Sequence, residues 1–419
     1  MRRVIVIGAG AAGSMAAIFA ASGGADTLLI ERTRDGGRKI LISGGGRCNV
    51  LPSRVDESRF VTDSSPNLLK KMVRAWPLAE QRAFFEHTLG IPLEEEVESL
   101  KLFPASHKAR DVRDGLLDYA RQVGVRMRME SRVVDVAPVD AGWEVTLDDG
   151  TVLKADAVII ATGGLSVPNT GSDGAGLNML KALGHTMHPT YAALTPLTTT
   201  DAAFNGLSGV SLTVSLTAKS ALQQATWCGG FLFTHHGYSG PSVLNVSHVA
   251  VRARAGHAPK GKLPTAKVHV QWTALGEKEW EDALKPHGAR TVTGALRAEM
   301  PDRLASALLV KANVEPTRPL TELRRDERLR LIEILVRGEL PWQGDEGYKK
   351  AEVMGGGVAL SEVDPRTMES RRHKGLYLCG EVLDAFGPIG GYNFLWAWST
   401  GRSAGAAAAA TVAATVAKE

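Results

Sequence analysis

Two kinds of hydrophobic pattern alternate at the start of the chain. Apolar residues run without a break from Val4 to Ile7 and from Leu28 to Ile30, as is typical of buried strands. The segment between them, Ala11 to Ser22, has its apolar residues at helical spacing. A strand, a helix and a second strand in this order form a βαβ unit, so the pattern predicts a parallel sheet.

The same alternation continues to about residue 160 and returns near the C-terminal end. Helical spacing and strand patterns follow one another at residues 66–89, 109–124, 132–136, 143–147, 157–160 and 375–379, and a last helix is expected after Asn393. These elements predict an α/β fold, with a doubly wound Rossmann-type sheet and an added antiparallel β-meander.

The middle of the chain has a different pattern, which predicts an insertion. From Thr190 onward, Thr, Ser and Gly punctuate alternating runs, as expected for a β-rich domain, and between Glu277 and Leu340 the period is helical again. We expect a discontinuous domain of residues 1–190 and 348–419, an inserted β-rich domain of residues 191–275 and a helical subdomain of residues 276–347.

Composition narrows the class of protein but does not select a partner. The 44% hydrophobic and 22% charged fractions are those of an ordinary globular protein. The 49 basic and 45 acidic residues leave a net charge of +4, too small to predict nucleic-acid binding. The 3 cysteines have no Cys-x-x-Cys spacing, and no export or membrane segment is expected. We expect a cytoplasmic protein with no metal and no membrane partner.

One local cluster of basic residues leaves two interpretations open. The arginines between residues 324 and 330 are interleaved with Asp326 and Glu327 in a segment of helical spacing. The more ordinary interpretation is a solvated helix face, and the alternative is a patch for RNA phosphates.

Three glycines join the first expected strand to the first expected helix. Gly8 permits a tight turn, Gly10 lets the backbone approach a diphosphate, and Gly13 allows close packing of the helix, whose N-terminus attracts the phosphates. Glu31 ends the second strand about 18 residues after Gly13. Its carboxylate can accept both ribose hydroxyls and disfavours the 2′-phosphate of NADP. The pattern therefore predicts FAD or NAD.

Further glycine clusters favour FAD. Residues 38–49 join Lys39 and Arg47, which can balance a diphosphate, to a glycine run whose backbone can approach a flat ring. Glycines also follow two later strands, and Gly390 and Gly391 precede the last helix. A helix N-terminus at this place favours the negative charge that a flavin accumulates on reduction. This order resembles that of two-dinucleotide flavoproteins.

Five segments resemble one known family. They are residues 38–49, 102–108, 168–174, 233–241 and 390–398. Their sequences are similar to those of the BaiN-like flavoproteins, also called the aminoacetone oxidase family of FAD-binding enzymes. The resemblance covers nearly the whole chain. It implies a FAD-binding Rossmann-type domain built from both chain ends, with an inserted β-barrel-like domain and a small helical subdomain.

We expect FAD as the cofactor and NADH or NADPH as a transient electron donor. No second strand, glycine turn and helix provides a separate nucleotide domain, so the reductant must share the substrate cleft or come from elsewhere. The residues expected to bind FAD lie on the glycine turns and beside them: Gly8, Gly10, Ala11, Ala12, Gly13, Glu31, Arg32, Arg38, Lys39, Ser43, Gly44, Gly45, Gly46, Arg47, Cys48, Asn49, Val134, Ala161, Thr162, Gly163, Gly164, Gly380, Glu381, Gly390, Gly391, Tyr392 and Asn393.

Two residues of the insert are candidates for proton transfer. His235 and Tyr238 lie just before Pro241, where a helix is expected to begin, and imidazole and phenol groups can donate a proton. Packing of both side chains is the alternative. Cys48 likewise has either a packing role or a redox role.

The expected activity is FAD-dependent reduction of a C=C bond conjugated to a carbonyl. Flavin N5 gives hydride and His235 or Tyr238 gives the proton, and the family resemblance implies enone-like steroids or uracil rings as acceptors. The alternatives are an amine or aminoketone oxidase that uses oxygen, and a flavoprotein that acts on uridine in ribosomal RNA. The expected partner is accordingly a small molecule or RNA.

Overall fold

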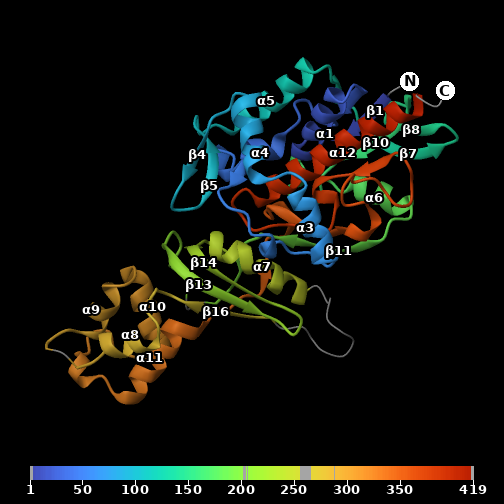
Figure 1. Ribbon diagram of the computed structural model, residues 1–419. Helices are drawn as coiled ribbons and strands as arrows, with labels where there is room; N and C mark the ends of the chain where they lie inside the picture. Colours follow the sequence, from blue (N-terminus) through green and yellow to red (C-terminus); the bar gives the residue numbers. More distant parts are fainter. Residues whose placement is uncertain (1–2, 202–203, 205, 255–265, 287, 417–419) are drawn as a thin grey trace. The chain divides into compact units, whose positions relative to one another are not determined.

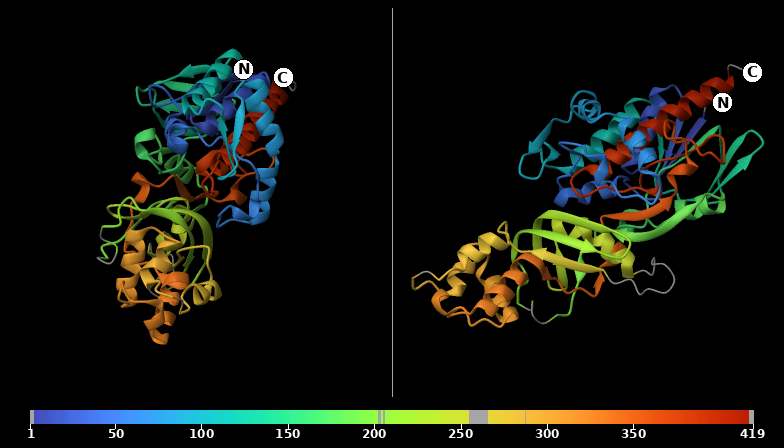
Figure 2. Two further views of the ribbon diagram at one scale, coloured as in Figure 1. Left: turned by 90° about the vertical axis from the view of Figure 1, so that its left-hand side faces the viewer. Right: turned by 60° about the horizontal axis from the view of Figure 1, so that its bottom comes forward.

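The computed structural model describes residues 3–201, 204, 206–254, 266–286 and 288–416, which fall into two compact units. Unit 1 contains Met1–Thr190 and Val353–Glu419, and unit 2 contains Tyr191–Glu352. Both chain ends therefore belong to unit 1, where the blue N-terminal and red C-terminal segments lie side by side (Figures 1 and 2).

A parallel sheet forms the centre of unit 1. Its strands lie in the order β20 (Leu376–Leu378), β10 (Ala157–Ile160), β1 (Arg3–Ile7), β2 (Asp26–Ile30) and β6 (Arg126–Arg128). The apolar runs of β1 and β10 are almost completely buried, as expected for strands covered on both faces. The predicted βαβ unit and the parallel sheet are confirmed.

Two helices from opposite ends of the chain pack along each other in unit 1. They are α1 (Ala11–Ser22) and α12 (Tyr392–Val416), and α5 (Ala109–Gln122) also contacts α1. Close approach requires glycine on α12, since a Cβ atom at Gly405 would lie 2.1 Å from the carbonyl oxygen of Ala16. This pairing joins the first and last helices of the chain into one layer against the sheet (Figure 1).

Smaller elements complete unit 1. The meander β7 (Val133–Val139), β8 (Gly142–Leu147) and β9 (Val152–Ala155) is antiparallel, as predicted. The others are α2 (Arg38–Ile42), η1 (Ser43–Gly46), β3 (Leu51–Pro52), η2 (Glu57–Arg59), α3 (Pro66–Arg74), α4 (Leu78–Ala83), η3 (Phe84–Thr88), β4 (Leu93–Glu96), β5 (Lys101–Pro104), η4 (Pro168–Thr170), α6 (Ala175–Ala182), β11 (Met187–Ala193), β19 (Val353–Val358), η8 (Leu360–Glu362) and η9 (Gly380–Val382).

The helix expected over residues 66–89 is divided, so this prediction is wrong in its continuity. Helix α3 ends at Arg74, and α4 begins after Pro77. Proline has no N–H to donate and disfavours helical geometry in the residue before it, which explains the break at Trp76 and Pro77.

Unit 2 combines an antiparallel sheet with helices. The sheet has the order β17 (Gly338–Glu339), β16 (Lys267–Gln271), β13 (Ser211–Lys219), β14 (Gln224–Phe233), β15 (Gly237–Ser239), β12 (Leu197–Thr198) and β18 (Gly344–Asp345). The helices are α7 (Pro241–Arg254), α8 (Glu277–Ala283), α9 (Val292–Arg297), α10 (Asp302–Ala312) and α11 (Arg325–Arg337), and shorter turns are η6 (Leu320–Glu322) and η7 (Gly347–Lys349).

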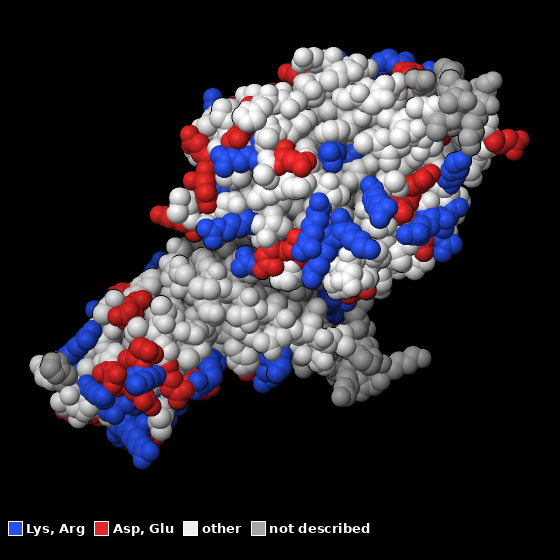
Figure 3. All heavy atoms as spheres, in the orientation of Figure 1, with Lys and Arg blue, Asp and Glu red and all other residues white. Residues whose placement is uncertain are grey.

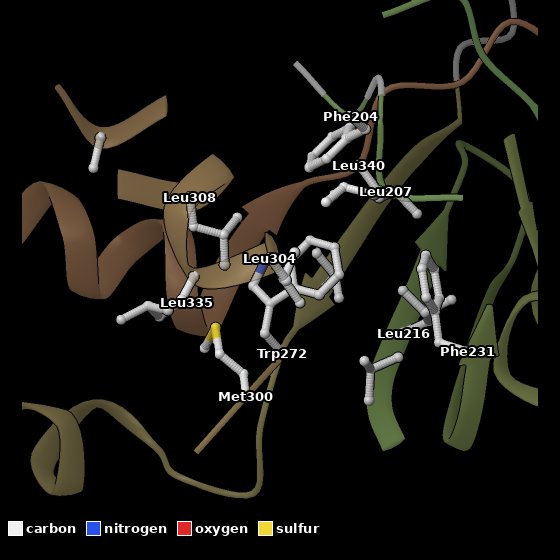
Figure 4. Packing of buried hydrophobic residues seen from close by; sticks show 14 of the residues in the cluster. Phe204, Leu207, Leu216, Phe231, Trp272, Met300, Leu304, Leu308, Leu335 and Leu340 are labelled. Atoms are coloured by element: carbon white, nitrogen blue, oxygen red, sulfur yellow. The ribbon is translucent and has the colours of Figure 1, made fainter. Parts of the chain in front are cut away.

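One hydrophobic cluster joins the strands and the helices of unit 2. Figure 4 shows Leu304 of α10 and Leu335 of α11 beside Trp272, which follows β16, while Phe231 extends the cluster to β14. All four side chains are buried. Both parts of the expected division, residues 191–275 and 276–347, contribute to this cluster. The division itself stays a prediction.

The described residues contain no helix with the length and apolar character of a membrane span. In the same part of the chain, no group of three or more His, Cys, Asp and Glu side chains is arranged to hold a metal ion.

Candidate cofactor site

The turn from β1 into α1 leaves open space where the sequence predicts a diphosphate. Gly8 has a φ of +103°, and a Cβ atom at Gly13 would lie 1.8 Å from the carbonyl oxygen of Gly8. A Cβ atom at Gly10, by contrast, would have no heavy atom within 4 Å. Gly10 precedes α1 and provides no side-chain cap. The N–H groups of Ala11 and Ala12, in the first turn of the helix, are therefore available to bind an anion.

Glu31 fastens this turn to the end of β2. Its Oε2 accepts the N–H of Ala9 at 2.8 Å, and its Oε1 accepts the N–H and the hydroxyl of Thr33, both at 2.8 Å. A carboxylate has about four acceptor positions, so about one remains for a ribose hydroxyl. Binding of both hydroxyls, as predicted, would require Glu31 to give up a contact. The neighbouring Arg32 forms an ion pair with Asp173.

The second glycine cluster has the backbone geometry that only glycine adopts easily. Gly44 and Gly45 have φ values of +55° and +68°, and Gly46 has a φ of +87°. Space is open beside Gly45, where a Cβ atom would have no heavy atom within 4 Å. Ser43 Oγ is not directed there but donates to the carbonyl oxygen of Ile40 at 2.7 Å.

An unsatisfied acceptor lies next to this cluster. Asn49 Oδ1 is buried and has no hydrogen-bond partner among the residues that the structure describes. It would lie 2.4 Å from a Cβ atom at Gly44. A buried amide oxygen without a donor is uncommon in folded proteins, and a bound group with an N–H can satisfy it. The flavin ring has such a group, so Asn49 fits the predicted cofactor.

The basic residues of this segment have carboxylate partners in the structure. Lys39 Nζ donates to Glu381 Oε2 at 2.7 Å. Arg47 Nη1 donates to Glu96 Oε1 at 2.9 Å, with its guanidinium 4.2 Å from the centre of the Phe103 ring. The charges of Lys39 and Arg47 are thus already neutralised by carboxylates, and the prediction that either residue balances a diphosphate stays a prediction. Arg38 is paired in the same way, with Asp35 at 2.8 Å.

Cys48 has the environment of a packing residue. It is completely buried, and burial raises the pKa of its thiol to about 12. Such a thiol stays protonated, whereas redox chemistry at cysteine proceeds through the thiolate. The structure thus favours packing over a redox role.

The ends of β10 and β20 lie against the first glycine turn. A Cβ atom at Gly8 would be 2.6 Å from the carbonyl oxygen of Ala161, and one at Gly380 would be 2.8 Å from Cβ of Ala12. Gly163 lies beside Glu381, since its Cβ position is 3.8 Å from Oε2 of that residue. The flanking Thr162 and Gly164 are partly exposed and buried, respectively. Residues from three distant segments thus meet at the carboxyl edge of the parallel sheet, where ligands bind in such folds.

The closing turn before α12 is held by its own side chains. Asn393 Oδ1 accepts the N–H of Gly387 and its Nδ2 donates to the carbonyl oxygen of Gly387, both at 2.9 Å. The Tyr392 hydroxyl donates to the carbonyl oxygen of Arg54 at 3.2 Å. Gly391 is required by close packing, as a Cβ atom there would lie 2.3 Å from the backbone of Leu51, and Gly390 has a φ of +104°.

Three further predicted site residues belong to other elements than the glycine turns. Val134 of β7 is 48% exposed. His235 is exposed on the turn between β14 and β15 of unit 2. Tyr238 is 0% exposed among Phe204, Phe231 and other aromatic rings of the same unit. Burial moves the pKa of Tyr238 far above its usual value, which disfavours loss of the phenolic proton, and the role of Tyr238 in proton transfer stays a prediction.

Sequence reasoning missed Ser166, which is fully buried and bonded to Glu381. Neither a motif nor a charge marks this serine in the sequence. The one available signal is its position in the segment that follows β10, two residues after Gly164. Residues that follow a parallel strand lie at the edge of the sheet where ligands bind.

The fold and these glycine turns define a FAD-binding oxidoreductase with a Rossmann-type domain. The open space at Gly10 and Gly45 and the unsatisfied Asn49 oxygen fit FAD. The family model "HI0933-like protein Rossmann domain" matches residues 2–407, and the chain belongs to this family.

Curated relatives cover nearly the whole chain. A ribosomal RNA dihydrouridine synthase of Escherichia coli strain K12 is 33% identical over 407 residues, which are 94% of this chain and 95% of that protein. A 3-dehydro-bile acid delta(4,6)-reductase of Clostridium scindens is 32% identical over 417 residues, which are 97% of this chain and 98% of that protein.

Solved flavoprotein structures share the fold. The 3-ketosteroid delta1-dehydrogenase of Sterolibacterium denitrificans has a TM-score of 0.53 at 11% identity, over 98% of this chain and 100% of that chain. A flavocytochrome c3 fumarate reductase has a TM-score of 0.50 at 18% identity, over 98% of this chain and 78% of that chain. At these identities the likeness concerns the fold alone.

Proposed function

We propose that the protein is a FAD-dependent reductase of a C=C bond conjugated to a carbonyl. The observation that carries the proposal is its match, over nearly the full chain, to two enzymes whose names both describe hydrogenation of a ring double bond. One name describes the formation of dihydrouridine, and the other describes reduction at the delta(4,6) positions of a 3-dehydro bile acid.

When bound, FAD would supply the hydride for this reduction. In unit 1, the start of α1 would hold the diphosphate, Glu31 fixes the turn before it, and Asn49 Oδ1 would accept an N–H of the flavin. The N-terminal end of α12 lies at the closing turn and favours negative charge near it.

His235 is proposed as the proton donor for the α carbon. Its imidazole is exposed, whereas the phenol of Tyr238 is enclosed by aromatic side chains. We expect His235→Gln to lower the rate of flavin reoxidation by an acceptor by about 100-fold, in the range for loss of a general acid. Tyr238→Phe should leave that rate within about twofold, because the phenol is out of contact with solvent. Equal rates in the wild type and His235→Gln would exclude His235.

The acceptor is tested by photoreducing the protein without oxygen and adding one compound at a time. A 3-keto-delta4 steroid or a uridine-containing RNA should reoxidise the flavin and gain two hydrogens. If neither reoxidises it, the proposed reaction is wrong. Release of hydrogen peroxide with an aminoketone as substrate would instead favour the oxidase alternative.

Uridine in ribosomal RNA is the second candidate acceptor, favoured by the identity to the Escherichia coli protein. Arg324, just before α11, and Arg330 of α11 do not add to this argument, because they are paired with Glu327 and Asp326. Figure 3 shows acidic and basic side chains intermixed over the helical part of unit 2. Salt-dependent binding of a ribosomal RNA fragment would support this acceptor, and absence of binding at low salt would exclude it.

The electron donor is proposed to be NADH or NADPH, bound transiently in the same site as the acceptor. Anaerobic titration with each nucleotide tests this step. Bleaching of the flavin by one of them at stoichiometric amounts is expected, and no bleaching by either would require another donor.

A further inference from the structure

Three polar side chains from distant parts of unit 1 form a closed triangle: Lys39, Ser166 and Glu381. Lys39 Nζ donates to Glu381 Oε2 at 2.7 Å and to Ser166 Oγ, and Ser166 Oγ donates to Glu381 Oε1 at 2.6 Å. The N–H of Met354 also donates to Oε1, at 2.7 Å. Both carboxylate oxygens are therefore fixed, and the carboxylate has one orientation.

The triangle is largely shielded from water. Ser166 is 0% exposed, and the side chains of Lys39 and Glu381 are 28% and 16% exposed. Removal of one charge from such a pair leaves the other without an opposite charge in a medium of low dielectric constant, where its field reaches further.

Its position is the ligand edge of the parallel sheet. Lys39 lies beyond the end of β2, Ser166 follows β10, and Glu381 follows β20. Oε2 of Glu381 lies against Gly163, one of the glycines expected at the cofactor. The charges of the triangle therefore act on whatever is bound there.

We propose that Lys39 is the counter-ion of Glu381 and that Ser166 fixes the pair, so that the carboxylate adds no net negative charge beside the flavin. A flavin gains negative charge on reduction, and an uncompensated carboxylate nearby opposes this change. The pair thereby sets the reduction potential of bound FAD. This role is independent of which acceptor the enzyme reduces, and it makes the three side chains positioning residues.

The sign of the effect distinguishes this role from a structural one. Sulfite is the probe, because it binds reversibly to oxidised flavin and its affinity rises with positive charge around the ring. Lys39→Met should lower the sulfite affinity of the FAD-loaded protein about tenfold. A parallel fall of about 30 mV in the two-electron potential corresponds to the same factor. Glu381→Gln should change both quantities in the opposite direction, since it leaves Lys39 as the uncompensated charge.

The double variant completes the test. Lys39→Met with Glu381→Gln removes both charges and should return the sulfite affinity to within about threefold of the wild type. Ser166→Ala, the milder change, should shift it in the direction of Lys39→Met, and Ser166→Thr should restore it because the hydroxyl returns. Lys181→Met, at an exposed lysine of α6, is the matched control and should change nothing.

Three results would overturn the proposal. One is a shift of both single charge variants in the same direction, as general disruption would produce. Another is a double variant no closer to the wild type than Lys39→Met. The third is loss of FAD from Lys39→Met with unchanged sulfite affinity in the loaded fraction, which would assign Lys39 to the diphosphate.

Discussion

Gly10 and Gly13 lie three positions apart at the start of α1, yet an added methyl group would meet different surroundings at each. At Gly13 it would overlap the carbonyl oxygen of Gly8, at 1.8 Å, so Gly13→Ala should destabilise the fold by about 3 kcal/mol or more. At Gly10 it would enter open space. Gly10→Ala should change the unfolding free energy by less than about 1 kcal/mol but lower FAD affinity at least tenfold.

Chemical denaturation and FAD titration of both variants check this prediction. Because the two changes add the same group, each variant is a control for the other. Normal FAD affinity in Gly10→Ala would show that the space beside Gly10 is not where the diphosphate lies.

A buried histidine makes the stability of unit 2 depend on pH. His248 of α7 is 6% exposed, and burial lowers its pKa to about 4 from the 6.5 expected in the unfolded chain. Arg252 lowers this pKa further. A folded-state pKa below the unfolded value means that stability is present above pH 6.5 and is lost as the pH falls through about 4.

The loss between pH 7 and pH 4.5 should be about 2.5 kcal/mol. Urea denaturation at the two pH values measures it, and His248→Asn provides the comparison, since it cannot titrate. A wild type and a variant with the same pH profile would contradict the assignment.

Residue roles were harder to predict than residue positions. The sequence predicted that Glu31, Lys39 and Arg47 contact the nucleotide. In the folded chain Glu31 accepts hydrogen bonds from Thr33, and Lys39 and Arg47 form ion pairs with Glu381 and Glu96. Charge in a sequence is visible at once, whereas the partner that neutralises it can lie more than 300 positions away, as Glu381 does from Lys39. Tyr238 illustrates the same limit, because only packing shows that its hydroxyl is enclosed.

At the scale of elements, the contact between α1 and α12 holds the two chain ends together. A Cβ atom at Gly405 would lie 2.1 Å from the carbonyl oxygen of Ala16, a backbone atom that cannot turn aside. Gly405→Ala should therefore lower the unfolding free energy by about 1 to 3 kcal/mol, despite the higher helix propensity of alanine.

The neighbouring position is the control for this change. Ala406 is exposed on the same helix, so Ala406→Leu should alter stability by less than about 0.5 kcal/mol. Thermal or chemical denaturation of both variants measures the change in unfolding free energy. A Gly405→Ala variant more stable than the wild type would contradict the packing described for α1 and α12.

Element boundaries followed from periodicity where one face is buried. The prediction of α1 matches the structure from Ala11 to Ser22, because a glycine turn marks its start and Gly23 follows its end. The prediction of one helix over residues 66–89 was wrong at Pro77. Proline disfavours helical geometry in the residue before it, and this effect outweighed the helical spacing of the apolar residues. The hydrophobic pattern of neighbouring residues could not predict the parallel pairing of β10 with β20, because all of unit 2 lies between these strands in the sequence.

For the whole molecule, FAD binding is linked to the stability of unit 1. A ligand that binds only the folded state stabilises it by about 2.7 kcal/mol at a free concentration of 100 times its dissociation constant. Scanning calorimetry of the FAD-free protein, with and without added FAD, should show an upward shift in the unfolding of unit 1. Added NADP at the same concentration should shift this transition less than FAD does, because Glu31 disfavours the 2′-phosphate at the cofactor site. An unchanged profile with FAD would contradict the site.

The central claim is that the protein carries FAD as its cofactor, and it is tested most directly by identifying the pigment of the purified protein. We predict a flavin absorption spectrum, and FAD as the compound released on denaturation. A colourless protein that takes up no added FAD, or one that releases a different flavin, would contradict the account.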